Sequence, residues 1–170
     1  MSYFTHAFEA EIERFGVGKV RQVFYKVLFL PPGLEAELPF NEYPRLRVEG
    51  EIAEMSLRCA FIPAGDGRRY VIVPPDLCKN TGVDLGDVVE FRFRVDDQDF
   101  VDVPAPLEEA IQAAPALADI WSNLTAGKKR MFAHHVGSAK SEKTIAKRVA
   151  ETLDALALGM NLRDFKNLRR

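Results

Sequence analysis

Alternating apolar and polar side chains mark the first hundred residues as a region of β-strands. The clearest run is Val88–Val95, in which charged residues occupy one face. The four apolar residues of the other face are Val89, Phe91, Phe93 and Val95. Arg45–Ile52 alternates in the same way around Gly50, which predicts a strand with a bend or bulge at the glycine. Further strands are expected at 19–30, 56–63 and 69–74, where β-branched and aromatic residues are frequent. Residues 5–15 fit a strand or a helix.

Turn-forming residues separate these runs. Asp66-Gly67 has the sequence of a tight hairpin turn, and Gly86-Asp87 predicts a second turn before the last strand. Asp76 is expected to cap a short helix that Gly82 closes. Residues 33–43 are expected to form a loop with one helical turn.

The pattern changes to helical spacing after Val103. Helices are expected at about 106–113, 116–123, 126–139 and 142–158, with Thr125 and Ser141 as N-caps of the last two. In the last helix the apolar residues recur every three to four positions: Ile145, Val149, Leu153 and Leu156. Gly159 is expected to end it, and the tail to fray or form one more helical turn. The chain is therefore predicted to be α+β, with a β-domain at 5–103 and a helical domain at 104–170.

Charge is distributed unevenly between the two parts. Residues 1–125 carry 12 Lys and Arg against 21 Asp and Glu, whereas residues 126–170 carry 11 against 4. The net charge of −2 gives no sign of a general polyanion binder. Two cysteines, no signal-peptide pattern and no apolar run long enough for a membrane span predict a soluble, cytoplasmic protein.

No catalytic motif stands out, so an enzymatic function is not favoured and no catalytic residue, cofactor or metal is assigned. His134 and His135 are adjacent, and neighbouring helical residues point about 100° apart, which is poor geometry for sharing one metal. Cys59 lies in an apolar run and is expected to be buried, while Cys78 lies near a predicted helix start, which lowers thiol pKa values. The chain has neither a complete phosphate loop nor a G-x-S-x-G elbow.

The basic residues of two neighbouring predicted helices are the strongest candidates for a binding surface. They make up a candidate anion- or ligand-binding set: Lys128, Arg130, His134, Lys140, Lys147 and Arg148. Such a set can hold phosphates, nucleic acid or an acidic partner, or it can simply be solvated. Nucleic acid is not favoured, because the chain as a whole is slightly acidic. A small-anion site between the β-domain and the helices is the other alternative.

A family resemblance runs through about residues 5–158. The segments that carry it are Phe8–Ala10, Ile12–Arg14, Arg47–Ile52, Gly67 with Tyr70–Val73, Gly86–Val89, Val103-Pro104 with Leu107 and Ala110, Trp121, Leu124, Gly127–Arg130, Ala139-Lys140, Thr144 and Arg148. In order and spacing they resemble a bacterial family that joins domain of unknown function 1905 to a helical segment of the bacteriocin-protection, YdeI/OmpD-associated type. The chain departs from the family at Ile145, where members often have Arg, and near His135, where members often have an aromatic residue.

The resemblance implies a fold more than an activity. It implies a small double-split, AbrB-like β-barrel followed by a helical bundle. It also implies a non-enzymatic binding or stress- and bacteriocin-protection module, with a protein or a small anion as partner. The exposed strand edges of a split barrel leave homo-oligomer formation open.

Overall fold

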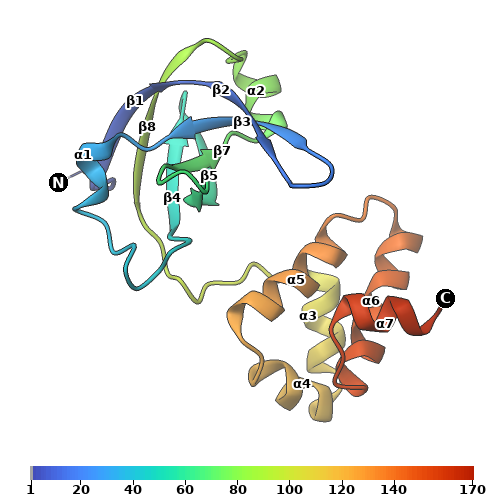
Figure 1. The fold of residues 1–170 in the computed structure, drawn as a ribbon. Helices are drawn as coiled ribbons and strands as arrows, with labels where there is room; N and C mark the ends of the chain where they lie inside the picture. Colours follow the sequence, from blue (N-terminus) through green and yellow to red (C-terminus); the bar gives the residue numbers. More distant parts are fainter. Residues whose placement is uncertain (1) are drawn as a thin grey trace. The chain divides into compact units, whose positions relative to one another are not determined.

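The structure, a computed structural model, describes residues 2–170, which divide into two compact units. One unit ends at Gln98 and holds all the strands, and the other is Asp99–Arg170 and holds five helices (Figure 1). The predicted α+β class is therefore confirmed. The domain limits of 5–103 and 104–170 stay a prediction.

The first unit, called here the sheet unit, contains two antiparallel sheets of four strands. The first has the order β1-β8-β4-β5 and the second β2-β3-β7-β6. Their bounds are β1 His6–Glu11, β2 Glu13–Val17, β3 Val23–Phe29, β4 Arg47–Ile52, β5 Met55–Ala60, β6 Ile62–Pro63, β7 Arg69–Ile72 and β8 Val88–Val95. Two short helices, α1 (Pro32–Glu35) and α2 (Pro75–Thr81), lie in the connections. Barrel closure stays a prediction, since the strand pairings above stay within each sheet.

The alternation in β4 and β8 builds the core of the sheet unit. Val48 and Ile52 of β4 are buried together with Phe91 and Phe93 of β8, as the pattern predicted. Val95, expected on the same face, is 38% exposed because it lies at the end of its strand. Four phenylalanine rings of this core form edge-to-face, tilted or stacked contacts at centroid distances of 5.1–6.4 Å: Phe8, Phe61, Phe91 and Phe93.

One local expectation for the sheet unit is wrong in part, and another is wrong. No bulge occurs at Gly50, which pairs in regular register with Leu57 on one side and Phe93 on the other. Asp76 lies inside the first turn of α2, because the helix already begins at Pro75, a favoured first helical position. The expected left-handed closure at Gly82 is confirmed by its φ of 80°.

The second unit, called here the helical unit, contains α3 Ala105–Gln112, α4 Pro115–Ser122, α5 Ala126–Gly137, α6 Glu142–Ala157 and α7 Leu162–Leu168. The predicted caps are present: Thr125 accepts from the Lys128 amide and Ser141 from the Thr144 amide. The predicted apolar stripe of α6 packs into the unit's own core, where Leu156 and Phe132 are buried. Within residues 2–170, none of the helices has the length and apolar character of a membrane span.

Candidate functional site

The helical unit contains an apolar cavity of 440 Å³. Its lining comes from α4, α5, α6, α7 and the connections between them: Ile120, Leu124, Lys128, Met131, Phe132, Leu156, Gly159, Met160, Asn161 and Asp164. Six of these ten side chains are large and apolar, and the polar ones are few. A cavity of this composition is typical of sites for small molecules, whose volumes are about 300–1,000 Å³.

Local sequence shapes the α6–α7 connection that borders this cavity. Gly159 adopts a left-handed φ of 65° and turns the chain sharply after α6. Asn161 then caps α7 by accepting a 2.9 Å hydrogen bond from the Asp164 amide. Met131 and Met160 face the cavity, and flexible thioether side chains adapt readily to different ligand shapes.

The polar groups of the cavity differ in whether they already have a hydrogen-bond or ion-pair partner within the protein. The Asp164 carboxylate accepts a 2.8 Å hydrogen bond from the Asn161 side-chain amide. Lys128 is exposed, and its ammonium group makes no hydrogen bond or ion pair with any residue from 2 to 170. The cavity therefore combines an apolar interior with one available cation.

Arg130 and Arg148, two of the six candidate residues, are half-buried and bind main-chain carbonyls. Arg130 donates from Nε and Nη2 to the Phe100 carbonyl oxygen at 3.1 and 2.9 Å, which fastens α5 to the segment before α3. Arg148 donates from Nη1 to the His135 carbonyl oxygen and to Ser138 Oγ, both at 2.9 Å. Both guanidinium groups thus hold the helical unit together.

The three other candidates, His134, Lys140 and Lys147, are exposed. Within the described chain they make no hydrogen bond or ion pair through their side chains. Of the six candidates, only Lys128 lines the cavity. A role of the other five in ligand binding stays a prediction.

Sequence reasoning did not find the apolar lining of this cavity. Met131, Met160 and Leu124 look like ordinary core residues in a helical pattern. One signal was available: Asn161 precedes Asp164 by three residues, the spacing of a helix N-cap, so a further helix after Gly159 could be expected. That helix provides one wall of the cavity.

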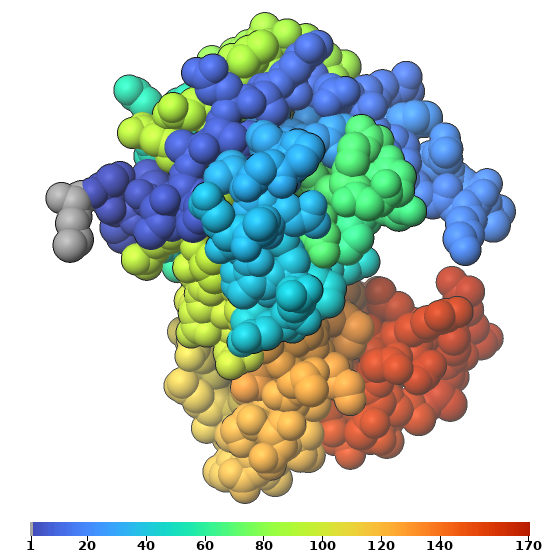
Figure 2. All heavy atoms as spheres, turned by 60° about the vertical axis from the view of Figure 1, so that its left-hand side comes forward, coloured from blue at the N-terminus to red at the C-terminus, as the bar shows by residue number. Residues whose placement is uncertain are grey.

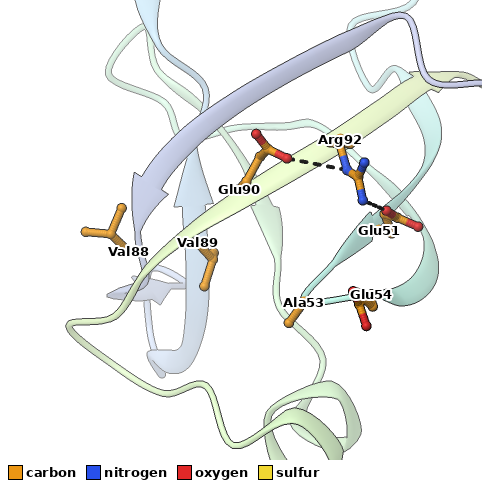
Figure 3. A pocket seen from close by; sticks show the side chains of 7 residues that line it. All are labelled: Glu51, Ala53, Glu54, Val88, Val89, Glu90 and Arg92. Carbon is orange, nitrogen blue, oxygen red and sulfur yellow. Dashed lines mark hydrogen bonds and ion pairs between the residues drawn. The ribbon is translucent and has the colours of Figure 1, made fainter. Parts of the chain in front are cut away.

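The sheet unit has an acidic hollow of 310 Å³ beside the β4–β5 turn, shown in Figure 3. Arg92 lies between Glu51 and Glu90 and forms ion pairs with both carboxylates (Figure 3). These charges already satisfy one another, so the hollow offers no comparable unpaired cation. Ala53 and Glu54 at its rim have φ values of 49° and 65°, a left-handed backbone that residues other than glycine rarely adopt.

Neither cysteine looks activated. Burial raises the pKa of the Cys59 thiol to about 12, although nearby Arg47 acts in the opposite direction. Cys78, which the sequence placed near a helix start, is only 9% exposed and belongs to the core of the sheet unit. Among residues 2–170 there is no group of three or more His, Cys, Asp or Glu side chains that could hold a metal ion.

The fold and the cavity define an α+β chain in which a two-sheet unit precedes a helical unit with an apolar cavity. Two family models match it: residues 8–93 match Domain of unknown function (DUF1905), and residues 101–159 match Bacteriocin-protection, YdeI or OmpD-Associated. The first match spans just over half of the chain. The protein therefore belongs to the DUF1905 family, and it carries a YdeI/OmpD-associated segment, as the resemblance predicted. No curated protein and no solved structure gives a match.

Proposed function

We propose that this protein is a non-enzymatic binding module whose helical unit takes up a small amphipathic anion. The observation that carries the proposal is the apolar cavity with the unpaired Lys128 ammonium among its lining residues. The apolar part of the ligand would occupy the cavity between Met131, Leu156 and Met160. Its anionic group would pair with Lys128. Protection against a bacteriocin or another stress is then a consequence of binding.

Physical chemistry supports this kind of ligand over a purely polar anion. A polar anion would leave six apolar side chains of the lining in contact with water. A neutral apolar molecule would leave Lys128 without a partner, whereas a carboxylate forms a charge-assisted hydrogen bond with an ammonium group. Only a molecule with both parts uses the whole cavity.

Decanoate and decanol form a suitable probe pair, because they share an apolar chain and differ in charge. Trp121, the chain's single tryptophan, packs against Phe132 at a ring-centroid distance of 6.4 Å, and Phe132 lines the cavity. Tryptophan fluorescence therefore reports binding without a label. Both probes should perturb it in a saturable way, and decanoate should bind more tightly than decanol.

Substitutions at the cavity test the assignment. Lys128→Gln should weaken decanoate binding roughly fivefold, because a charge pair at an exposed lysine is worth up to about 1 kcal/mol, and leave decanol binding unchanged. Lys140→Gln is the matched control, since Lys140 is an exposed lysine of the same unit outside the cavity. Leu124→Asp should weaken both probes. Absence of saturable binding, or equal losses in the two lysine variants, would rule the proposal out.

Nucleic-acid binding through the basic helices, by analogy with AbrB-like barrels, has weaker support. Arg130 and Arg148 are engaged with main-chain carbonyls and are not available to phosphates. Double-split barrel closure of the sheet unit also remains part of what we propose, resting on the family resemblance.

A further inference from the structure

The β2–β3 hairpin extends beyond the sheet to which it belongs. β2 pairs with β3 from Glu13↔Val27 to Val17↔Val23, but β7 pairs with β3 only at Val27–Phe29. The hairpin is therefore two-stranded towards its tip at residues 18–22. Figure 2 shows this blue segment projecting from the sheet unit. Every residue from 17 to 25 is exposed.

The exposed side chains of the hairpin are unusually apolar. Val20 at the tip is 103% exposed, and four more large apolar residues are 37–49% exposed: Val17, Val23, Phe24 and Tyr25. A two-stranded ribbon has no interior in which to bury them. Val17, Val23 and Tyr25 share one face of the ribbon and Phe24 lies on the other, so exposed apolar side chains occur on both sides of the tip and mark an interaction surface.

Cations accompany the apolar tip. Val20 lies between Lys19 and Arg21, and neither side chain makes a hydrogen bond or ion pair within residues 2–170. Arg14 lies nearby on β2, with its guanidinium carbon 3.8 Å from the centroid of the Phe24 ring. Residues 13–26 hold four basic side chains and one acidic, within a sheet unit that carries more acidic than basic residues overall. The hairpin is thus a locally positive part of an acidic unit.

The backbone at the hairpin tip requires a glycine. Gly18 has a φ of 120°, and a Cβ atom there would lie 2.4 Å from the Arg21 carbonyl oxygen. The chain can close at this point only with glycine. Val20 and its flanking cations therefore follow a turn whose conformation depends on Gly18.

We propose that the β2–β3 hairpin docks on an anionic lipid surface. The three valines enter the boundary between headgroups and acyl chains, and Phe24 and Tyr25 lie at headgroup level, where aromatic rings are favoured. Lys19, Arg21 and Arg14 face the negative headgroups. Single-stranded nucleic acid fits the surface less well. The valines offer neither stacking nor hydrogen bonds, and the Phe24 ring already packs on Arg14 and Gly16.

Sedimentation of the full chain with vesicles tests this proposal. The protein should bind vesicles of equimolar phosphatidylcholine and phosphatidylglycerol, bind phosphatidylcholine vesicles much less, and be released by added salt. Val20→Asp should weaken binding roughly tenfold or more, since it replaces an inserted apolar group with a charge repelled by the lipid. Lys19→Gln and Arg21→Gln should each weaken it roughly fivefold.

The controls separate the hairpin from other exposed groups. Val88→Asp changes a valine that is 66% exposed on β8, and it should leave vesicle binding unchanged. Circular dichroism should show Val20→Asp folded, because the Val20 side chain has no packing to lose. The proposal fails if neither vesicle binds, or if the Val20 and Val88 variants lose binding equally. It also fails if a single-stranded oligonucleotide binds through Lys19 and Arg21 while vesicles do not.

Discussion

At the scale of single residues, Gly50 shows how tightly the sheet unit is assembled. A Cβ atom at this position would lie 2.3 Å from the Arg92 carbonyl oxygen and 2.6 Å from a Phe91 ring carbon. Backbone cannot move aside cheaply, so Gly50→Ala should destabilise the unit by about 2–3 kcal/mol, measured as a lower urea midpoint. Gly127→Ala is the matched control: its Cβ meets nothing within 4 Å, and alanine favours the helix by about 0.5–1 kcal/mol. An unchanged midpoint for the Gly50 variant would contradict this.

The sequence pointed to Gly50 as a special position but suggested the wrong reason. A glycine inside an alternating strand indicates either a bulge or a close approach of backbone, and only the packing decides between them. The same limit applies to the candidate site. Residue type identified Lys128, but pairing of Arg130 and Arg148 with distant carbonyls depends on tertiary geometry. Their charges alone could not distinguish a ligand-binding role from a structural one.

At the scale of elements, Arg148 joins α6 to the end of α5. Its guanidinium group donates to the His135 carbonyl and to Ser138, the C-cap residue of α5, where helix carbonyls lack partners. Arg148→Ala should destabilise the helical unit by about 1–3 kcal/mol in urea unfolding followed by circular dichroism. Arg148→Lys should recover only part of this, because a lysine cannot reproduce the guanidinium geometry. Lys147→Ala, on an exposed neighbour, should have little effect; equal losses would refute the capping role.

The backbone conformation of the β4–β5 turn has an effect on stability that can be tested. Ala53 and Glu54 both have positive φ values, as in a two-residue hairpin turn that favours an asparagine followed by a glycine. The double substitution Ala53→Asn with Glu54→Gly should raise the free energy of unfolding by about 1 kcal/mol in urea. Ala53→Val should lower it, because a β-branched side chain fits the left-handed region poorly. If the double variant is less stable, the present pair makes contacts that outweigh its backbone strain.

Periodicity predicted elements better than it predicted their ends. The helices at 105–112, 115–122, 126–137 and 142–157 agree with the sequence expectation to within two residues, because their apolar spacing and caps are local. The strand expected from residue 19 begins only at Val23. Val20, Val23 and Phe24 have strand-like composition, but no third strand of the described chain covers them. Composition alone cannot show that a strand-like run lies in an exposed hairpin.

At the scale of the whole molecule, stability should fall in acid. The pKa of Glu49 lies below its usual value, chiefly because Tyr3 donates a 2.5 Å hydrogen bond to its carboxylate. A hydrogen bond from the Arg94 guanidinium group to the same carboxylate lowers this pKa further. A carboxylate with a lowered folded pKa stabilises fully above its unfolded pKa, and this contribution is lost as pH falls through the folded value. Arg68 and Lys26 lower the pKa values of Asp66 and Asp84 in the same direction.

Glu49→Gln should therefore flatten the acid side of the stability profile. The free energy of unfolding in urea should be measured between neutral pH and pH about 3, an interval that covers the ordinary pKa values of carboxylates. The variant should lose less stability over that interval than the parent protein. Glu9→Gln, an exposed glutamate on β1, serves as the control and should keep the parent slope. A slope unchanged in the Glu49 variant would exclude this carboxylate as a contributor.

The two units have separate cores, so each should fold alone when the chain is divided at the right place. Every buried residue of the first core lies before residue 94, and every one of the second lies after residue 103.

The structure divides the chain after Gln98, whereas the sequence predicts a division after Val103. These two divisions predict different stabilities for the helical fragment. A fragment beginning at residue 104 lacks the Phe100 carbonyl that Arg130 binds and lacks Val103, which packs on the helical core. It should be less stable in urea than the fragment 99–170 by about 1–3 kcal/mol. Arg130→Gln should shrink that difference, because only the longer fragment has the bond to lose. Equal stability of the two fragments would place residues 99–103 outside the helical unit.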